Sequence, residues 1–227
     1  MSDNGEHLAG EQAYLDVLYA RLDTVRAEAA HQLDRVRRTR AEGTPANRTE
    51  RDALARFYEN RVAQLAAVDD RLCFGRLDLT DDRQRYIGRI GLSDDARAQL
   101  LVDWRAPAAR PFYQATGAEP GEVVRRRHLI TRRRRVVGVE DEVLDLDALD
   151  ERERAELTCE GALLAAVTAP RTGRMGDIVA TIQAEQDRII RADHRGVLVV
   201  QGGPGTGKTA VALHRAAWLL YTYRDRL

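Results

Sequence analysis

The sequence predicts an α+β chain in which a long antiparallel helical hairpin and a small β-rich segment lead into the start of an α/β domain. Three observations predict this order. Apolar residues recur every three or four positions through residues 11–68, which is the period of a helix. From about residue 72 the apolar runs become short and are separated by glycines, as in strands. An apolar run at 196–201 then enters a glycine-rich loop. The expected parts are residues 1–71, 72–150 and 151–227.

Length and composition limit the class of protein. The chain has 227 residues, with 36 Lys and Arg against 36 Asp and Glu, so its zero net charge gives no overall attraction to nucleic acid or anionic lipid. Contact with DNA or RNA would come only from local patches. The polar N-terminus is not a signal peptide, and no apolar run approaches the ~18 residues of a membrane span. We expect a cytoplasmic protein without membrane contact. Cys73 and Cys159 match no metal or redox spacing and are expected to be buried or partly buried free thiols.

The first part carries two one-sided apolar stripes, at residues 11–42 and 47–68. Charged residues fill the other positions, as around a heptad seam. Residues 43–45 interrupt the pattern, and Asn47 with Glu50 is typical of a helix N-terminus. Two helices joined by a short turn predict an antiparallel coiled-coil arm that reaches on the order of 40 Å at 1.5 Å per residue. The arm either packs along its own domain or projects toward a partner. The stripe residues are Leu15, Leu18, Leu22, Val25, Ala29, Leu33, Val36, Leu54, Phe57, Tyr58, Val62, Leu65 and Val68.

The second part predicts a small, strongly bent antiparallel sheet or barrel. Its candidate strands are residues 72–77, 85–90, 100–104, 111–115, 122–130 and 134–144. Seven arginines lie within residues 125–135. They either form a phosphate-backbone patch for nucleic acid or point outward and pair with the acidic stretch 140–150. Trp104 is either a stacking platform or a core residue beside a turn.

The third part predicts helices at 151–167 and 177–191, a buried strand at 196–201 and a helix at 208–223. Between this strand and the last helix, Gly202, Gly207, Lys208 and Thr209 complete the pattern G-x-x-x-x-G-K-[ST]. Glycines allow backbone N–H groups to point at phosphates, next to the positive end of a helix dipole. The chain therefore predicts the start of a P-loop NTPase α/β domain that binds ATP with Mg²⁺.

Residue roles follow from the same chemistry. Lys208 is expected to neutralise the β- and γ-phosphates, and the Thr209 hydroxyl to ligate Mg²⁺, so these two are the candidate catalytic residues. Lys208 is the only lysine among 36 Lys and Arg, at the one place where a compact ammonium suits and a guanidinium fork does not. The predicted nucleotide-binding residues of the loop are Gly202, Gly203, Pro204, Gly205, Thr206, Gly207, Lys208 and Thr209.

The stretch before the loop, Ile-Gln-Ala-Glu-Gln at 182–186, is similar to the adenine-binding glutamine motif of UvrD/Rep-like superfamily 1 helicases. The stretch after it, with Val211, His214, Arg215, Ala217, Trp218 and Leu219, resembles the first helix of the same helicases. The resemblance implies that Gln186 binds the adenine of ATP. Many members carry an arginine directly after the loop threonine, where this chain has Ala210, so adenine affinity would depend more on Gln186.

The residues before position 182 resemble HelD-type proteins, which are UvrD-like ATPases that bind bacterial RNA polymerase. Residues 86–89, 103–107 and 138–145, together with the long hairpin, carry this resemblance. It implies that the coiled-coil arm enters the secondary channel of the polymerase. ATP-driven movement of a helicase-like core would then strip nucleic acid from stalled polymerase and recycle it.

Two other functions stay open: a conventional ATP-dependent DNA helicase of the UvrD/Rep type, and a non-catalytic polymerase-binding arm. The sequence up to Leu227 has neither the aspartate-glutamate strand nor the arginine finger of such helicases. We expect it to be the N-terminal part of a longer ATP-hydrolysing enzyme and to be inactive alone.

Overall fold

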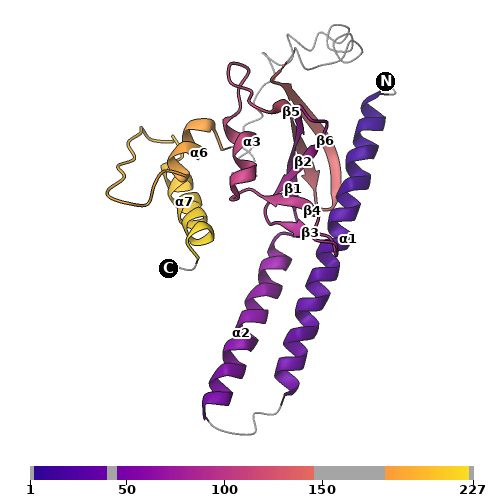
Figure 1. The fold of residues 1–227 in the computed structure, drawn as a ribbon, viewed down its shortest axis with the longest axis vertical. Helices are drawn as coiled ribbons and strands as arrows, with labels where there is room; N and C mark the ends of the chain where they lie inside the picture. Colours follow the sequence, from indigo (N-terminus) through magenta and orange to yellow (C-terminus); the bar gives the residue numbers. More distant parts are fainter. Residues whose placement is uncertain (1–2, 40–44, 146–181, 225–227) are drawn as a thin grey trace.

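The structure is a computed structural model that describes residues 3–39, 45–145 and 182–224. It has an α+β fold with a long N-terminal helix and a mixed six-stranded sheet (Figure 1). The helices are α1 (Asp3–Arg38), α2 (Pro45–Ala67), the 3₁₀ turn η1 (Pro107–Ala109), α3 (Arg110–Gln114), α6 (Ala184–Ile190) and α7 (Lys208–Thr222). The strands are β1 (Cys73–Leu79), β2 (Gln84–Gly88), β3 (Leu92–Ser93), β4 (Gln99–Asp103), β5 (Val123–Arg132) and β6 (Arg135–Val143).

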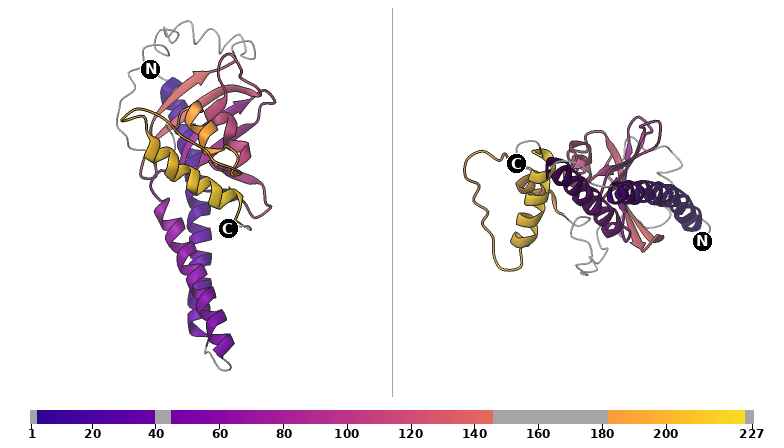
Figure 2. Two further views of the ribbon diagram at one scale, coloured as in Figure 1. Left: turned by 90° about the vertical axis from the view of Figure 1, so that its left-hand side faces the viewer. Right: turned by 90° about the horizontal axis from the view of Figure 1, so that it is seen from below.

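Helix α1 serves two parts of the molecule. Its N-terminal half lies along one face of the sheet, where Leu15, Leu18 and Leu22 are buried. Its C-terminal half pairs with α2 in a two-helix arm that extends away from the sheet (Figures 1 and 2). Arg37 of α1 and Glu59 of α2 form an ion pair of 2.7 Å across this arm. One half of the predicted hairpin therefore packs on its own domain, and the rest projects.

The sheet is open and mixed, so the expectation of an antiparallel sheet or barrel is wrong. Its strand order is β3-β4-β2-β1-β5-β6. The pair β2–β4 is parallel, and the other neighbours are antiparallel. The chain runs from β2 through the short strand β3 before it returns to β4, and this crossover makes the parallel pair possible. Strand β3 could not be predicted from the sequence, because two residues give no alternating pattern.

Helix α3 covers the second face of the sheet, where residues 111–115 had been predicted as a strand. That prediction was wrong. Pro107 and Pro111 stand at the first positions of η1 and α3, where a missing N–H costs nothing and a fixed φ favours the helix. A Cβ on Gly75 of β1 would lie 2.2 Å from the ring of Phe112. Glycine at this position therefore lets α3 approach the sheet closely.

Two clusters of buried residues hold these layers together. One lies between α1 and the sheet and includes Tyr19, Leu72 and Cys73. The other lies under α3, α6 and α7 and includes Trp104 and Trp218. Trp104 is thus a core residue beside a turn and not an exposed stacking platform. Cys73 is a buried free cysteine, as predicted, and burial raises the pKa of its thiol to about 12.

Residues 197–200 are not the buried strand that the sequence predicted. They have no regular secondary structure, and Val197 and Val199 are 92% and 80% exposed. A buried parallel strand needs a neighbour on each side and cover on both faces. The described strands all belong to the N-terminal sheet, so none is available to pair with this run. The structure therefore does not show the start of a P-loop α/β domain.

The predicted helix at 151–167, the loop after it and Cys159 lie outside the described residues, as does the start of the predicted helix at 177–191. The part of that helix that is described begins later than predicted, at Ala184. The division into residues 1–71, 72–150 and 151–227 stays a prediction. Among the helices of the described ranges, none is long and apolar enough to cross a membrane.

Candidate functional site

The glycine loop curves into the N-terminus of α7. Gly205 and Gly207 have φ angles of 79° and 82°, in the left-handed region that favours glycine. Gly207 is the N-cap of α7, and Lys208 is its first residue. The first backbone N–H groups of a helix lack partners within the helix, and the dipole makes this end positive. The loop thus offers backbone donors and a positive potential to an anion.

Lys208 and Thr209 are exposed in the first turn of α7. The Lys208 ammonium Nζ donates hydrogen bonds to the carbonyl oxygens of Gly202 at 2.7 Å and Gly203 at 2.6 Å. The Thr206 hydroxyl donates to the Gly203 carbonyl at 2.9 Å. An accessible ammonium inside a curved glycine backbone fits the phosphates of a nucleotide. The threonine hydroxyls of this segment are oxygen ligands of the kind that Mg²⁺ prefers.

Gln186 lies against the back of this loop. Its side-chain Nε2 donates to the Thr206 carbonyl at 3.4 Å, and its Oε1 accepts from the backbone N–H of Gln183 at 3.2 Å. The second bond belongs to a reciprocal capping box that starts α6. A Cβ on Gly207 would lie 3.1 Å from Gln186 Nε2, so glycine also permits this contact. A contact between this amide and adenine would replace its present bonds to Thr206 and Gln183.

A buried ion pair fixes α6 directly behind Gln186. Asp187 is fully buried and accepts a hydrogen bond from Arg191 Nε at 2.8 Å and from the Gln114 amide at 2.7 Å. The Arg191 guanidinium also donates to the Trp104 carbonyl at 2.7 Å and to the Arg105 carbonyl at 3.1 Å. The Gln114 bond joins α6 to α3, and the bonds from Arg191 to the two carbonyls join α6 to the turn after β4. These hydrogen bonds connect the predicted nucleotide site to the N-terminal sheet.

The segment at residues 103–107 contacts α7 as well. Arg105 forms a bidentate ion pair with Asp103, with bonds of 2.8 and 2.6 Å, and its guanidinium lies 4.7 Å from the ring centroid of Tyr221. The hydrogen bond to Asp103 raises the pKa of Arg105 above its ordinary value. The Trp104 ring meets His214 edge to face at 5.4 Å. The two stretches that carried the sequence resemblances therefore pack against each other.

The arginines at 125–135 differ in whether acidic side chains lie beside them. Four of them form ion pairs within the protein. The expected pairing with the acidic stretch 140–150 holds for Arg126 and Arg127, whereas Arg125 and Arg134 pair with aspartates outside that stretch. These pairs are Arg125 with Asp78 at 3.9 Å, Arg126 with Glu142 at 2.5 Å, Arg127 with Asp141 at 2.5 Å, and Arg134 with Asp69 at 2.5 Å and Asp23 at 2.6 Å. Arg127 also pairs with buried Glu11 of α1, which Arg76 contacts too. This network joins α1 to the sheet.

The structure thus brings Gln186 and the glycine loop together, while their roles in nucleotide binding stay predictions. It also places Gln114, Asp187 and Arg191 next to them, which the sequence analysis did not single out. The i,i+4 spacing of Asp187 and Arg191 was a visible signal for an ion pair, but their burial was not. In the described ranges, no group of three or more His, Cys, Asp or Glu is placed to hold a metal ion.

Comparison with known families gives a match over residues 8–156 to the family described as the N-terminal domain of DNA helicase IV HelD. The match covers more than half of the chain and takes in the arm and the sheet. It ends before α6 and the glycine loop, so the resemblance of those residues to UvrD/Rep helicases stays a prediction. No curated protein matches the chain significantly.

Proposed function

The chain belongs to the family of the N-terminal domain of DNA helicase IV HelD, and we propose that it is the N-terminal part of an ATP-dependent, UvrD-like motor factor that binds bacterial RNA polymerase. In this proposal the arm of α1 and α2 docks into the polymerase. ATP-driven movement of a helicase-like core then promotes release of the polymerase from nucleic acid and its recycling.

The observation that carries the docking proposal is the exposure of the arm. No described residue of α1 after Ala29, and none of α2 before Leu65, is buried. Leu54 and Phe57 of α2 are 46% and 53% exposed. Two isolated helices leave their apolar seam half in water and gain little stability from each other. Exposed apolar residues on a projecting element are typical of a surface that a partner covers.

The glycine loop supports the nucleotide part of the proposal. Lys208 and the loop glycines provide a cation and backbone donors suited to the triphosphate, and Thr209 provides a hydroxyl suited to Mg²⁺. Bound ATP with Mg²⁺ supplies the phosphoryl group whose hydrolysis would drive movement. This chain's contribution is to hold the phosphates and to couple the loop to the N-terminal sheet through α6.

The test is a pull-down with bacterial core RNA polymerase. The variant replaces residues 34–62 with a short Gly-Ser turn and keeps the buried part of α1 and Leu65, which support the body. A point variant, Leu54→Ser with Phe57→Ser, removes the exposed apolar contacts and keeps the arm. Val17→Ser is the matched control, because Val17 is 51% exposed but lies on the body half of α1.

We expect the wild type and Val17→Ser to bind, and the two arm variants to lose binding. Equal binding by all four proteins would contradict docking through the arm. Absence of binding by the wild type would remove the polymerase from the proposal and favour a UvrD-type DNA helicase. A retained arm contact in a protein that binds no ATP would favour the non-catalytic polymerase-binding arm.

A further inference from the structure

The hairpin turn between β5 and β6 carries three arginines that are not part of the ion-pair network between α1 and the sheet. Arg132, Arg133 and Arg135 are exposed. Within the part of the chain that the structure describes, no hydrogen bond or ion pair engages their guanidinium groups, whereas Arg134 between them is held by two carboxylates. We call Arg132, Arg133 and Arg135 the arginine turn.

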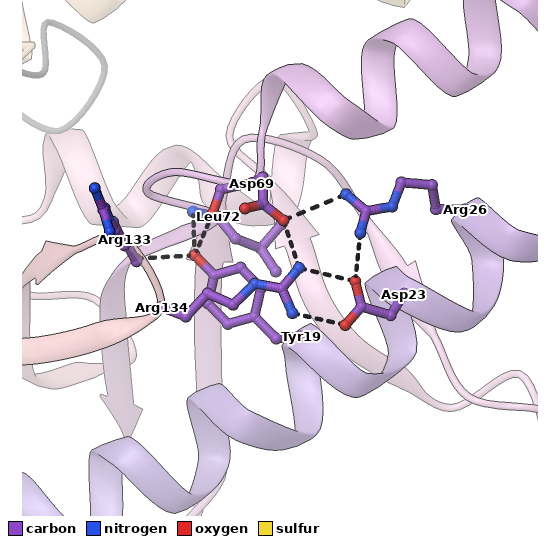
Figure 3. A network of polar contacts seen from close by, with 7 residues as sticks. All are labelled: Tyr19, Asp23, Arg26, Asp69, Leu72, Arg133 and Arg134. Atoms are coloured by element: carbon purple, nitrogen blue, oxygen red, sulfur yellow. Dashed lines mark hydrogen bonds and ion pairs between the residues drawn. The ribbon is translucent and has the colours of Figure 1, made fainter.

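Nearby carboxylates already have partners. Asp69 pairs with Arg134 at 2.5 Å and with Arg26 at 3.4 Å (Figure 3). Asp70 accepts the backbone N–H of Arg133 at 2.9 Å. The hydrogen bonds to Asp23 and Asp69 raise the pKa of Arg134. The acidic residues around the turn thus hold its backbone and its central side chain. Among the described residues, no carboxylate neutralises the outer guanidinium groups.

The turn is also rigidly mounted. The Tyr19 hydroxyl of α1 donates to the Arg133 carbonyl at 3.2 Å (Figure 3). The Gln12 amide donates to the Arg134 carbonyl at 3.0 Å and accepts from the Val136 N–H at 2.9 Å. A binding surface on such a support loses little backbone freedom when a ligand arrives.

The arrangement has a local cost. Arg132 and Arg135 lie directly opposite each other in the ladder of β5 and β6. Like charges that face each other across two strands destabilise the pair. Beside the turn is an open hollow of about 1090 Å³, lined by residues 69–71 and 131–135. A polyanion bound in or along this hollow would attract both guanidinium groups and so offset their mutual repulsion.

We propose that the arginine turn binds the phosphodiester backbone of nucleic acid. The inference rests on the proposed function, because a factor that frees polymerase from nucleic acid acts next to that polymer. Guanidinium groups match phosphate oxygens with two parallel hydrogen bonds, and contacts to the backbone need no particular base sequence. The site lies where the arm joins the body, because Arg134 bonds to Asp23 of α1 and to Asp69, which follows the end of α2.

The experiment measures binding of the 227-residue chain to a dye-labelled oligonucleotide by fluorescence anisotropy over a salt series, as single strand and as duplex. The test variant is R132Q/R133Q/R135Q. The matched control is R48Q/R56Q/R97Q, which removes three exposed arginines elsewhere and lowers the net charge equally. Circular dichroism melting confirms that all three proteins fold alike.

We expect the test variant to lose affinity by roughly tenfold or more at moderate salt. The slope of log affinity against log salt should fall by about 2 for the single strand or about 3 for the duplex, because each lost phosphate contact contributes roughly 0.7 or 0.9. The control should keep the wild-type slope. Stronger binding of one form identifies it as the ligand.

Three results would overturn the inference: an unchanged slope in the test variant, an equal loss in the control, or displacement of the oligonucleotide by polyglutamate at an equal charge concentration. The last result would mean that the turn binds an acidic protein surface. Lys208→Ala should leave oligonucleotide binding intact while it weakens ATP binding. Failure of the nucleotide proposal is therefore distinguishable from failure of this one.

Discussion

At the residue scale, nucleotide binding depends most directly on Lys208. Its ammonium lies within the curve of the loop, bonded to the carbonyls of Gly202 and Gly203. An arginine would carry the same charge in a longer planar fork with no compact point charge. All the remaining Lys and Arg positions of the chain hold arginine. The substitution Lys208→Arg therefore tests whether binding depends on the shape of the side chain or only on its charge.

We expect both Lys208→Ala and Lys208→Arg to weaken binding of a fluorescent ATP analogue with Mg²⁺ by about tenfold or more. Charge-assisted hydrogen bonds contribute about 1.5–3 kcal/mol, and each 1.4 kcal/mol is a factor of ten in affinity. Arg195→Ala is the control, since it removes an exposed cation upstream of the loop. Wild-type affinity in Lys208→Ala would show that the loop does not bind the nucleotide.

At the element scale, the position of α6 decides whether the glycine loop and the N-terminal sheet act as one unit. This helix has seven residues and would not be stable alone. Its stability comes from the buried pair of Asp187 and Arg191, the amide of Gln114 and the carbonyls at residues 104–106. Because Gln186 precedes Asp187, any displacement of this pair moves the side chain that touches the loop.

Asp187→Ala should lower the free energy of unfolding by about 3–5 kcal/mol, because it leaves the buried Arg191 charge without its carboxylate. The double variant Asp187→Leu with Arg191→Met should lower the free energy of unfolding by less, since it leaves no buried charge without a partner. Arg188→Ala, at an exposed position of the same helix, should change stability by less than about 0.5 kcal/mol.

Urea unfolding followed by tryptophan fluorescence measures these differences. Trp104 and Trp218, the two tryptophans of the chain, both lie in the cluster under α6 and α7. A matching loss of ATP affinity in Gln114→Leu would show that the support positions Gln186. Equal stability of Asp187→Ala and the wild type would mean that α6 is held by its apolar contacts alone.

At the scale of the whole molecule, the body and the arm differ in how they are stabilised. The body is a sheet with a buried cluster on each face, whereas the arm is two helices without a third layer (Figures 1 and 2). A partner that covers the arm would therefore supply contacts that the isolated chain lacks. The arginine turn of the β5–β6 hairpin lies beside the base of the arm, because Arg134 bonds to Asp23 of α1 and to Asp69 after α2.

The variant with residues 34–62 replaced should lose helical circular dichroism but keep its melting temperature within about 4 °C of the wild type. The buried residues of the body remain in place, and a change of about 1 kcal/mol shifts the midpoint by roughly 2–4 °C at this chain length. A much lower melting temperature would show that the arm stabilises the body, and binding losses on its removal would then need the point variants for their interpretation.

Particular residues show where sequence-based prediction succeeded. The spacing of Leu15, Leu18 and Leu22 predicted a helix with one buried side, and this side lies on the sheet. Prediction failed where a local pattern met a different neighbour. Residues 111–115 resemble a strand, but Pro111 lies in the first turn of a helix that packs on Gly75. Residues 197–200 have the composition of a buried strand, but no described strand lies beside them.

The sequence by itself determined the helical arm, the strands β1, β2, β4, β5 and β6, and the glycine loop with its single lysine, because these depend on residue period and on local backbone chemistry. Only the tertiary structure decided that the sheet is mixed and that Asp187 and Arg191 tie the loop to the sheet. It also decided that, among the residues it describes, Arg134 has two carboxylate partners while Arg132, Arg133 and Arg135 have none. These features join residues far apart in the chain. Burial and charge pairing depend on which surfaces meet in space, and no local pattern records that.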